Sequence, residues 1–175
     1  MRQLRADRNR LEEVYRARGL PANDARWSPS FRCVALFRLS RYLFVNGRRL
    51  AARFVWQINM MLTGADISPI CDLGDGLVVI HPVATTLAGS AGRRLTVEGH
   101  GGLGGGLALD DIGAGPGLPV LGDDVLLARG ASVLGPVSIG SRVRIGPGCT
   151  VTRDLPDDTE VKEHDIRVRL RAQAD

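Results

Sequence analysis

An apolar residue occupies every sixth position through most of the second half of the chain. A helix would space apolar residues by three and four, and an amphipathic strand would alternate them. A fixed period of six fits neither pattern and indicates a short structural repeat. The longest unbroken run is Leu121, Leu127, Val133, Ile139, Ile145 and Val151. Four residues after each member of this run comes another small or apolar residue, from Val125 to Leu155.

Each repeat unit reads apolar–Gly–x–x–small–x, as at 121–126 and 139–144. The first residue of a unit is expected to point inward, and the glycine after it permits a tight turn. Three units close one triangular coil, and stacked coils bury their apolar positions in one continuous column. The pattern therefore predicts a mainly β protein, a parallel β-helix. The same six-residue grid holds Ile67, Leu73 and Val79, and also Val97, Leu103 and Leu109.

The residues before the repeats have helical composition. Breaks are expected at Pro21 and around residues 46–47, and Ser30 is expected to cap the helix that runs through Phe44. The predicted divisions are an α-helical N-terminal region over 1–62, a β-helix over 63–155 with a glycine-rich loop at 99–117, and a C-terminal tail over 156–175.

Charge divides the chain unevenly. Residues 1–53 hold thirteen arginines against Asp7, Glu12, Glu13 and Asp24, whereas the rest of the chain is acidic. One interpretation is a solvated helical face that complements an acidic β-helix, its own or a neighbour's. The other is attraction to anionic membrane lipid or to an acidic polymer, which would allow peripheral membrane contact. No stacking aromatics alternate with the arginines, so the pattern does not point to nucleic acid.

Cysteine usage and hydropathy favour the cytoplasm. The three cysteines form no CxxC pair, and Cys71 and Cys149 fall on inward positions, as small core side chains do. The N-terminal stretch 1–18 is rich in Arg and Glu and does not resemble a signal peptide. Arginines interrupt the apolar stretch 31–62, so no run reaches the ~20 residues that span a bilayer.

Three motifs carry a family resemblance: Gly-Ala-Asp-Ile-Ser-Pro at 64–69, Leu-Gly-Asp-Gly-Leu at 73–77 and Ile-His-Pro at 80–82. With the repeats, they resemble the hexapeptide-repeat acyltransferases. The more specific similarity is to serine O-acetyltransferases and the related short exopolysaccharide O-acetyltransferases. The resemblance implies a left-handed parallel β-helix, a homotrimer, and acetyl-CoA or another acyl-CoA as co-substrate.

The resemblance also implies a catalytic pair. The sequence separation of Asp66 and His81 is the one that this family uses for its catalytic Asp and His. His81 would be the general base that takes the proton of the acceptor hydroxyl. Asp66 would hold the imidazole in the required tautomer. Because this separation is slightly less than the three repeat units of one coil, the two are expected near one corner of adjacent coils. The alternative is that His81 is only a surface or interface histidine.

The glycine-rich segment is the candidate donor site. By the resemblance, Gly104 and Gly105 would lie along the pantetheine arm between two subunits, and Arg129 and Gly130 would continue the groove. His100, about one coil after His81, is a candidate second polar group. The alternatives are a loop without a ligand and a solvated histidine. The segment lacks the Lys-Ser/Thr of a phosphate-binding loop, and the histidines lack metal-ligand spacing, so no metal is expected.

The chain departs from serine acetyltransferases at four places. Ile80 replaces the Asp before the catalytic His, Leu118 replaces a second His, and Ser68 replaces the His of the first motif. Residues 161–166 replace a terminal Gly-x-Pro-Ala stretch. Charged groups of free serine would lack partners in such a site. We therefore expect an acyl-CoA-dependent O-acyltransferase acting on a sugar or small-molecule hydroxyl. The alternatives are a serine O-acetyltransferase and a non-catalytic trimeric scaffold.

Overall fold

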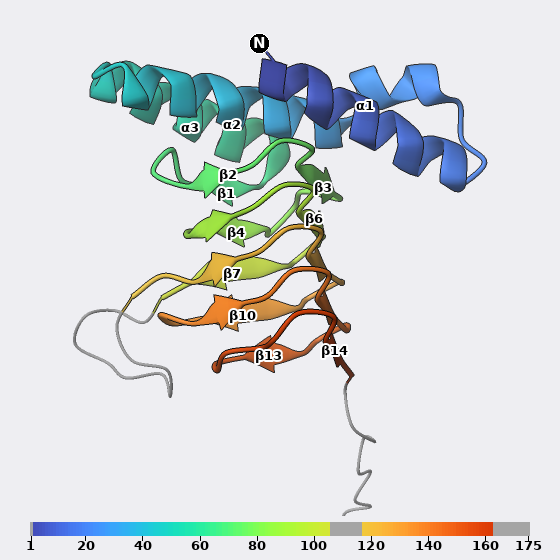
Figure 1. Cartoon of the computed structure of the whole chain (residues 1–175). Helices are drawn as coiled ribbons and strands as arrows, with labels where there is room; N and C mark the ends of the chain where they lie inside the picture. Colours follow the sequence, from blue (N-terminus) through green and yellow to red (C-terminus); the bar gives the residue numbers. More distant parts are fainter. Residues whose placement is uncertain (1, 106–116, 163–175) are drawn as a thin grey trace, which may run out of the picture.

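The computed structural model describes residues 2–105 and 117–162. A layer of helices covers one end of a tall stack of short strands (Figure 1). The helices are α1 (Arg2–Ala17), the 3-10 helix η1 (Ala22–Trp27), α2 (Pro29–Val45) and α3 (Arg49–Thr63).

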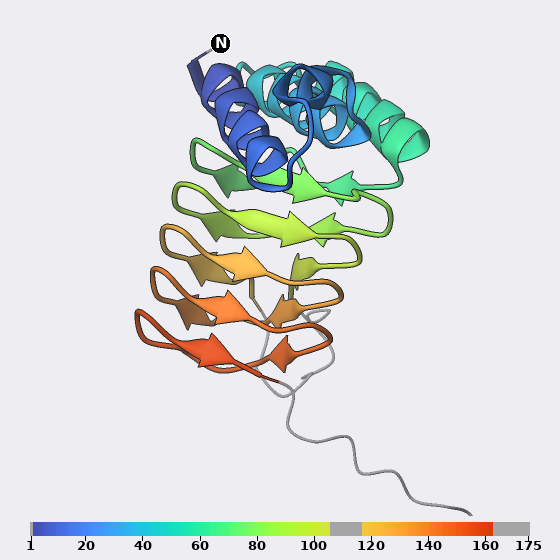
Figure 2. The ribbon, with the colours of Figure 1, turned by 90° about the vertical axis from the view of Figure 1, so that its right-hand side faces the viewer.

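The strands form three parallel sheets, which the chain visits in turn as it winds down the stack (Figures 1 and 2). The first sheet orders β1 (Asp66–Ile67), β4 (Thr86–Leu87), β7 (Gly102–Gly104), β10 (Ser132–Leu134) and β13 (Thr150–Val151). The second orders β2 (Asp72–Leu73), β5 (Ser90–Ala91), β8 (Val120–Leu121) and β11 (Ser138–Ile139). The third orders β3 (Val78–Ile80), β6 (Thr96–Glu98), β9 (Leu126–Leu127), β12 (Arg144–Ile145) and β14 (Glu160–Val161).

The six-residue grid marks the inward column of this stack. Each of its described residues is buried in a short strand, and register pairs it with its counterpart one coil away, as Val97 pairs with Leu127. Full burial of each such side chain contributes roughly 1.5–3 kcal/mol. The predicted left-handed parallel β-helix with helices before it is confirmed. Leu109, also on the grid, lies outside the described residues.

The β-helix extends past Leu155, the boundary predicted from the sequence. Leu155 pairs with Ile139, and Val161 in β14 pairs with Ile145. The two residues of each pair are closer in the sequence than three full repeat units, because the repeat unit that begins at Val151 is two residues short. The short unit moves Val161 off the six-residue grid, so the grid predicted that the β-helix ends at Leu155.

A buried ion pair ties the helical layer to the first coil. Asp7 of α1 is 1% exposed, and its carboxylate accepts hydrogen bonds from Arg38 Nε at 2.8 Å and Nη2 at 3.0 Å. The same carboxylate accepts from the backbone N–H groups of Gly76 and Leu77, both at 2.8 Å. Arg38 also donates to the carbonyl of Leu73. These contacts fix α1 and α2 over the open end of the β-helix, where Phe37 enters the main core.

The N-cap of α2 is Ser28, two residues before the predicted Ser30. Ser28 Oγ accepts from the N–H of Phe31 at 3.1 Å, and Pro29 takes the first helical position. Proline is favoured there because it needs no N–H partner and its φ suits a helix. The Ser30 hydroxyl therefore has no capping role.

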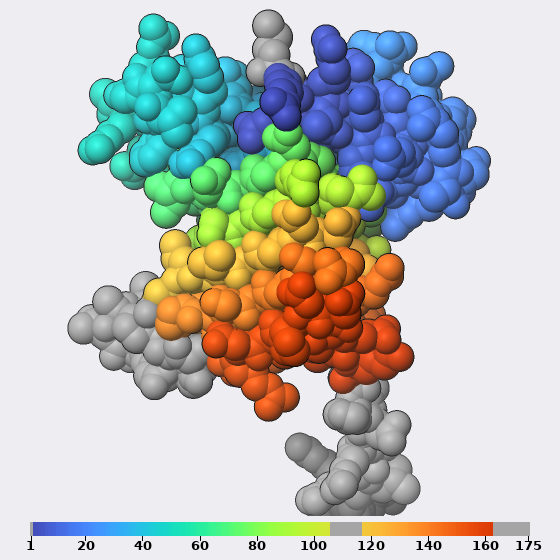
Figure 3. Space-filling view, viewed as in Figure 1, coloured from blue at the N-terminus to red at the C-terminus, as the bar shows by residue number. Residues whose placement is uncertain are grey.

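The helical layer extends sideways beyond the β-helix (Figure 3). No acidic residue occurs between Asp24 and Asp66, and several large apolar side chains are exposed on α2 and α3, among them Tyr42 and Phe54. Among residues 2–105 and 117–162, no helix is long and apolar enough to cross a membrane.

Candidate active site

His81 opens an enlarged corner of the first coil. Five residues, 81–85, join β3 to β4, whereas three residues, 99–101, make the corresponding turn between β6 and β7. The two extra residues widen the corner directly below the helical layer. His81 is exposed and has a φ of +54°. Positive φ is uncommon for residues other than glycine, but in this β-helix it recurs at turns of other coils, as at Asp124 and Arg142.

Gly99 lies directly beside His81 in the next coil. The register that pairs Ile80 with Glu98 continues to this pair, and a Cβ on Gly99 would approach the His81 carbonyl oxygen to 2.7 Å and its Cβ to 3.1 Å. Only glycine fits this approach. The Gly99 carbonyl then accepts from the N–H of Gly130 at 3.1 Å, so Arg129 and Gly130 lie one coil further along the same corner.

Asp66 lies at the end of this corner that is opposite His81. Its backbone N–H donates to the carbonyl of Thr85, the last residue of the enlarged corner, at 2.9 Å. Its carboxylate accepts a hydrogen bond from the indole N–H of Trp56 on α3, also at 2.9 Å. Among the described residues, no ion pair or hydrogen bond joins the side chains of Asp66 and His81. The structure thus brings both predicted residues to one corner, and Trp56 fixes the carboxylate.

His100 follows Gly99, the residue that lies beside His81. It is exposed with a φ of +63°, and its N–H donates to the carbonyl of Val83 at 3.3 Å. This backbone bond joins His100 to the enlarged corner. Its imidazole has no hydrogen-bond partner within the described part of the chain.

Gly104 and Gly105 lie at a different corner of the triangle. The short strand β7 runs from the turn beside His81 to Gly104, so the first sheet separates these glycines from Arg129 and Gly130. A Cβ on Gly105 would collide with the carbonyl oxygen of Gly117, where the description of the chain resumes, whereas Gly104 has room for one. Most of the predicted loop 99–117 lies outside the described residues. A single copy therefore does not bring the four predicted donor-site residues into one groove.

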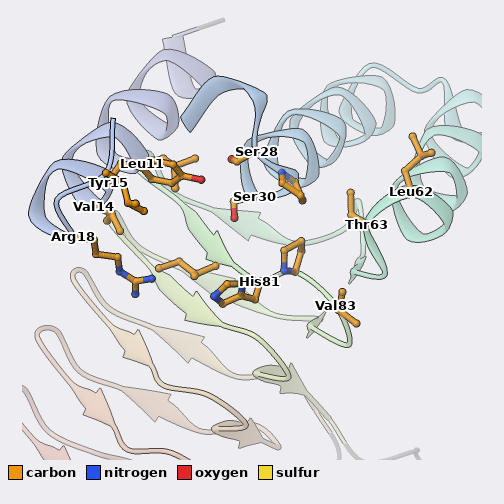
Figure 4. A pocket seen from close by; sticks show the side chains of 14 residues that line it. Leu11, Val14, Tyr15, Arg18, Ser28, Ser30, Leu62, Thr63, His81 and Val83 are labelled. Atoms are coloured by element: carbon orange, nitrogen blue, oxygen red, sulfur yellow. The ribbon is translucent and has the colours of Figure 1, made fainter. Parts of the chain in front are cut away.

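A pocket of about 460 Å³ opens between the helical layer and the enlarged corner (Figure 4). His81 lies at its floor beside Ile80, and Arg18, just past the end of α1, lies at one side (Figure 4). The N-terminus of α2 forms its roof with Ser28 and Ser30. The remaining lining residues are Leu11, Val14, Tyr15, Leu20, Pro29, Leu62, Thr63, Pro82 and Val83. Among the residues that the structure describes, no cluster of His, Cys, Asp and Glu could hold a metal ion.

Comparison with known proteins identifies the family. Residues 119–153 match the family model "Bacterial transferase hexapeptide (six repeats)". The chain is 33% identical over 135 residues to the serine acetyltransferase of Mycobacterium tuberculosis, covering 76% of this chain and 57% of that protein. It is 30% identical over 145 residues to the serine acetyltransferase of Helicobacter pylori, covering 78% of this chain and 81% of that protein. The chain belongs to the serine acetyltransferase family. The resemblance to hexapeptide-repeat acyltransferases is thereby confirmed.

The fold agrees with this serine acetyltransferase family. A solved structure of the Brucella abortus serine acetyltransferase in complex with coenzyme A superposes with a TM-score of 0.82, at 22% identity. The match covers 95% of this chain and 66% of that one. The chain spans about half the length of the first curated relatives it matches, 54% and 57%.

Three side chains near His81 and Asp66 were not predicted from the sequence to lie there. Arg18, Ser30 and Trp56 come from the helical layer, where no motif points to a site, and Ser30 was predicted only as a helix cap. Each lies far from His81 in the sequence, so only the packing of the helices on the first coil brings them to the site. The sequence held one weak signal of how the helices dock: an arginine in an apolar helical stretch, such as Arg38, needs a partner, and here that partner is Asp7.

Proposed function

We propose that this protein transfers an acetyl group from acetyl-CoA to the hydroxyl of a small acceptor, with His81 as the general base. The observation that carries the proposal is the position of His81. It lies exposed at the enlarged corner, on the floor of a pocket that the helical layer covers. Membership of the serine acetyltransferase family supports this chemistry, and so does the Brucella enzyme solved with coenzyme A.

In the proposed reaction His81 takes the proton of the acceptor O–H, and the oxygen forms a bond to the thioester carbonyl carbon. The C–S bond then breaks, and the imidazolium returns its proton to the departing thiolate. Such proton transfer typically contributes roughly 10²–10⁴-fold to the rate. Asp66 is proposed to orient the imidazole and to stabilise its positive form. Trp56 acts as a positioning residue, because its N–H fixes the carboxylate.

The donor site is proposed to form between copies of a homotrimer. Gly104 and Gly105 lie at one corner of the triangle, and Arg129 and Gly130 lie at another together with His81. When copies pack side by side, the glycine corner of one copy can face the His81 corner of its neighbour. A groove between copies would then hold the pantetheine arm against backbone that carries no side chain.

L-Serine is the acceptor that the comparisons favour, because the matching relatives are serine acetyltransferases. These relatives support serine better than the sugar or other small-molecule hydroxyl expected from the sequence. One observation keeps the neutral acceptor as a second candidate. Ile80, beside His81 in the pocket, is an apolar and 7% exposed side chain that offers no charge to an amine.

The test follows free thiol release from acetyl-CoA in the presence of L-serine or of a panel of sugars. The proposal predicts release that depends on the acceptor and falls by at least about 10²-fold in His81→Ala. Arg16→Gln is the control, because Arg16 is exposed, pairs with Glu12 and does not line the pocket. If acetyl-CoA fails to bind in a thermal-shift titration, the proposal is wrong and the scaffold alternative gains support.

A further inference from the structure

The His81 pocket contains one cation and no carboxylate. Fourteen residues line it, all in the described part of the chain, and none of them is Asp or Glu. Arg18 is the one arginine among them. An ammonium group entering this pocket would lose water without gaining an opposite charge, which is costly. An anionic group would meet the Arg18 guanidinium.

The Arg18 guanidinium has donors available for an anion. Its Nη2 donates to Glu98 Oε1 at 3.4 Å, and this long contact is its one hydrogen bond to a described side chain. A guanidinium carries five N–H donors arranged to match a carboxylate. In Figure 4 the guanidinium is directed toward the His81 side of the pocket. Glu98 itself is not among the residues that line the pocket.

Ser30 supplies a second donor from the roof. It is 9% exposed, and its hydroxyl makes no hydrogen bond to any other described residue, since Ser28 performs the capping. Figure 4 shows this hydroxyl pointing into the pocket from the first turn of α2. The N-terminus of a 17-residue helix carries partial positive charge that favours an anion at the same place.

From these observations we propose that the pocket recognises the carboxylate of a hydroxy-acid acceptor through Arg18 and Ser30. The pocket makes no ionic contact with an ammonium group. This inference rests on the proposed acetyl transfer at His81, and it names the acceptor class. L-Serine fits by its carboxylate alone, and its amine contributes nothing to binding. A neutral sugar lacks the group that the pocket selects.

Binding is measured by isothermal titration calorimetry of the full-length protein with 3-hydroxypropanoate, L-serine, L-serinamide and 1,3-propanediol. The two carboxylates should bind with Kd values within about threefold of each other, and the two molecules without a carboxylate should bind at least tenfold more weakly. Arg18→Gln should weaken 3-hydroxypropanoate tenfold or more, and Ser30→Ala severalfold. Glu98→Gln should tighten it, because Glu98 competes for Arg18. Arg16→Gln in the last turn of α1 is the matched control, since Arg16 pairs with Glu12 outside the pocket.

Two results would overturn the inference. One is equal binding of 3-hydroxypropanoate by Arg18→Gln and Arg16→Gln. The other is L-serine binding tenfold tighter than 3-hydroxypropanoate, which would show recognition of the amine. Failure of the proposed function looks different: carboxylate binding would remain sensitive to Arg18, while acetyl-CoA would release no thiol with any acceptor.

Discussion

Removing the Asp7 carboxylate should destabilise the protein far more than removing any exposed charge. Asp7 and Arg38 are 1% and 9% exposed, and the carboxylate accepts four hydrogen bonds, two of them from backbone N–H groups of the first coil. Asp7→Ala would leave the guanidinium buried without its counter-charge and two N–H groups without an acceptor. Breaking a buried ion pair in this way costs about 3–5 kcal/mol. For a chain of this size, that lowers Tm by about 6–20 °C.

The assay is urea or thermal unfolding at one fixed protein concentration, because assembly of copies would otherwise contribute to the measured stability. Glu12→Gln is the control, since the Arg16–Glu12 pair is exposed and should contribute less than about 1 kcal/mol. The double variant Asp7→Ala with Arg38→Met should lose clearly less than the sum of the single losses, because neither charge is then left alone. A loss below about 1 kcal/mol in Asp7→Ala, the range of an exposed pair, would refute the reasoning that this pair holds α1 on the β-helix.

Three further predictions concern the enlarged corner and the thiols. Gly99→Ala should lower the free energy of unfolding by about 1–3 kcal/mol in urea titrations and reduce turnover, because the new Cβ would displace the corner that holds His81, the proposed base. Trp56→Phe should lower kcat by about tenfold or more with little change in KM, since Asp66 loses a hydrogen bond worth about 1.5–3 kcal/mol; an unchanged kcat would contradict the positioning role. Burial raises the pKa of the Cys33 thiol from 9.0 to about 11, so iodoacetamide at mildly alkaline pH should modify the half-buried Cys149 first, as peptide mass mapping would show. The raised pKa favours the neutral thiol in the folded state, so this contribution to stability is present below pH 9.0 and is lost as the pH rises toward about 11.

The repeat made the β-helix predictable because each inward residue obeys a local rule. Leu121, Leu127 and Val133 are all buried because each holds the inward position of its own repeat unit. The repeat rule failed after Leu155, where the last coil is two residues short, and the separate capping prediction missed Ser28 by two residues. Pairing with β12 decides where β14 lies, whereas a local hydrogen bond from the Phe31 N–H to Ser28 decides the cap.

The site was less predictable because its residues come from distant parts of the chain. The spacing of Asp66 and His81 placed both at one corner, since a coil of known length fixes where residues recur. Nothing in the spacing of Arg18, Ser30 or Trp56 relates them to His81. Their positions depend on how the helices dock on the first coil. That docking depends on the ion pair between Asp7 and Arg38, which are far apart in the sequence.

The role of His81 as the base is tested most directly by the rate of thiol release from acetyl-CoA. We would compare wild-type protein with His81→Ala, using L-serine and 3-hydroxypropanoate as acceptors. We expect acceptor-dependent release with both molecules in the wild type, and a fall of roughly 10²–10⁴-fold in the variant, with its fold intact by circular dichroism. Equal rates in the two proteins, or no acceptor-dependent release in either, would contradict the claim that His81 is the base of an O-acetyltransferase.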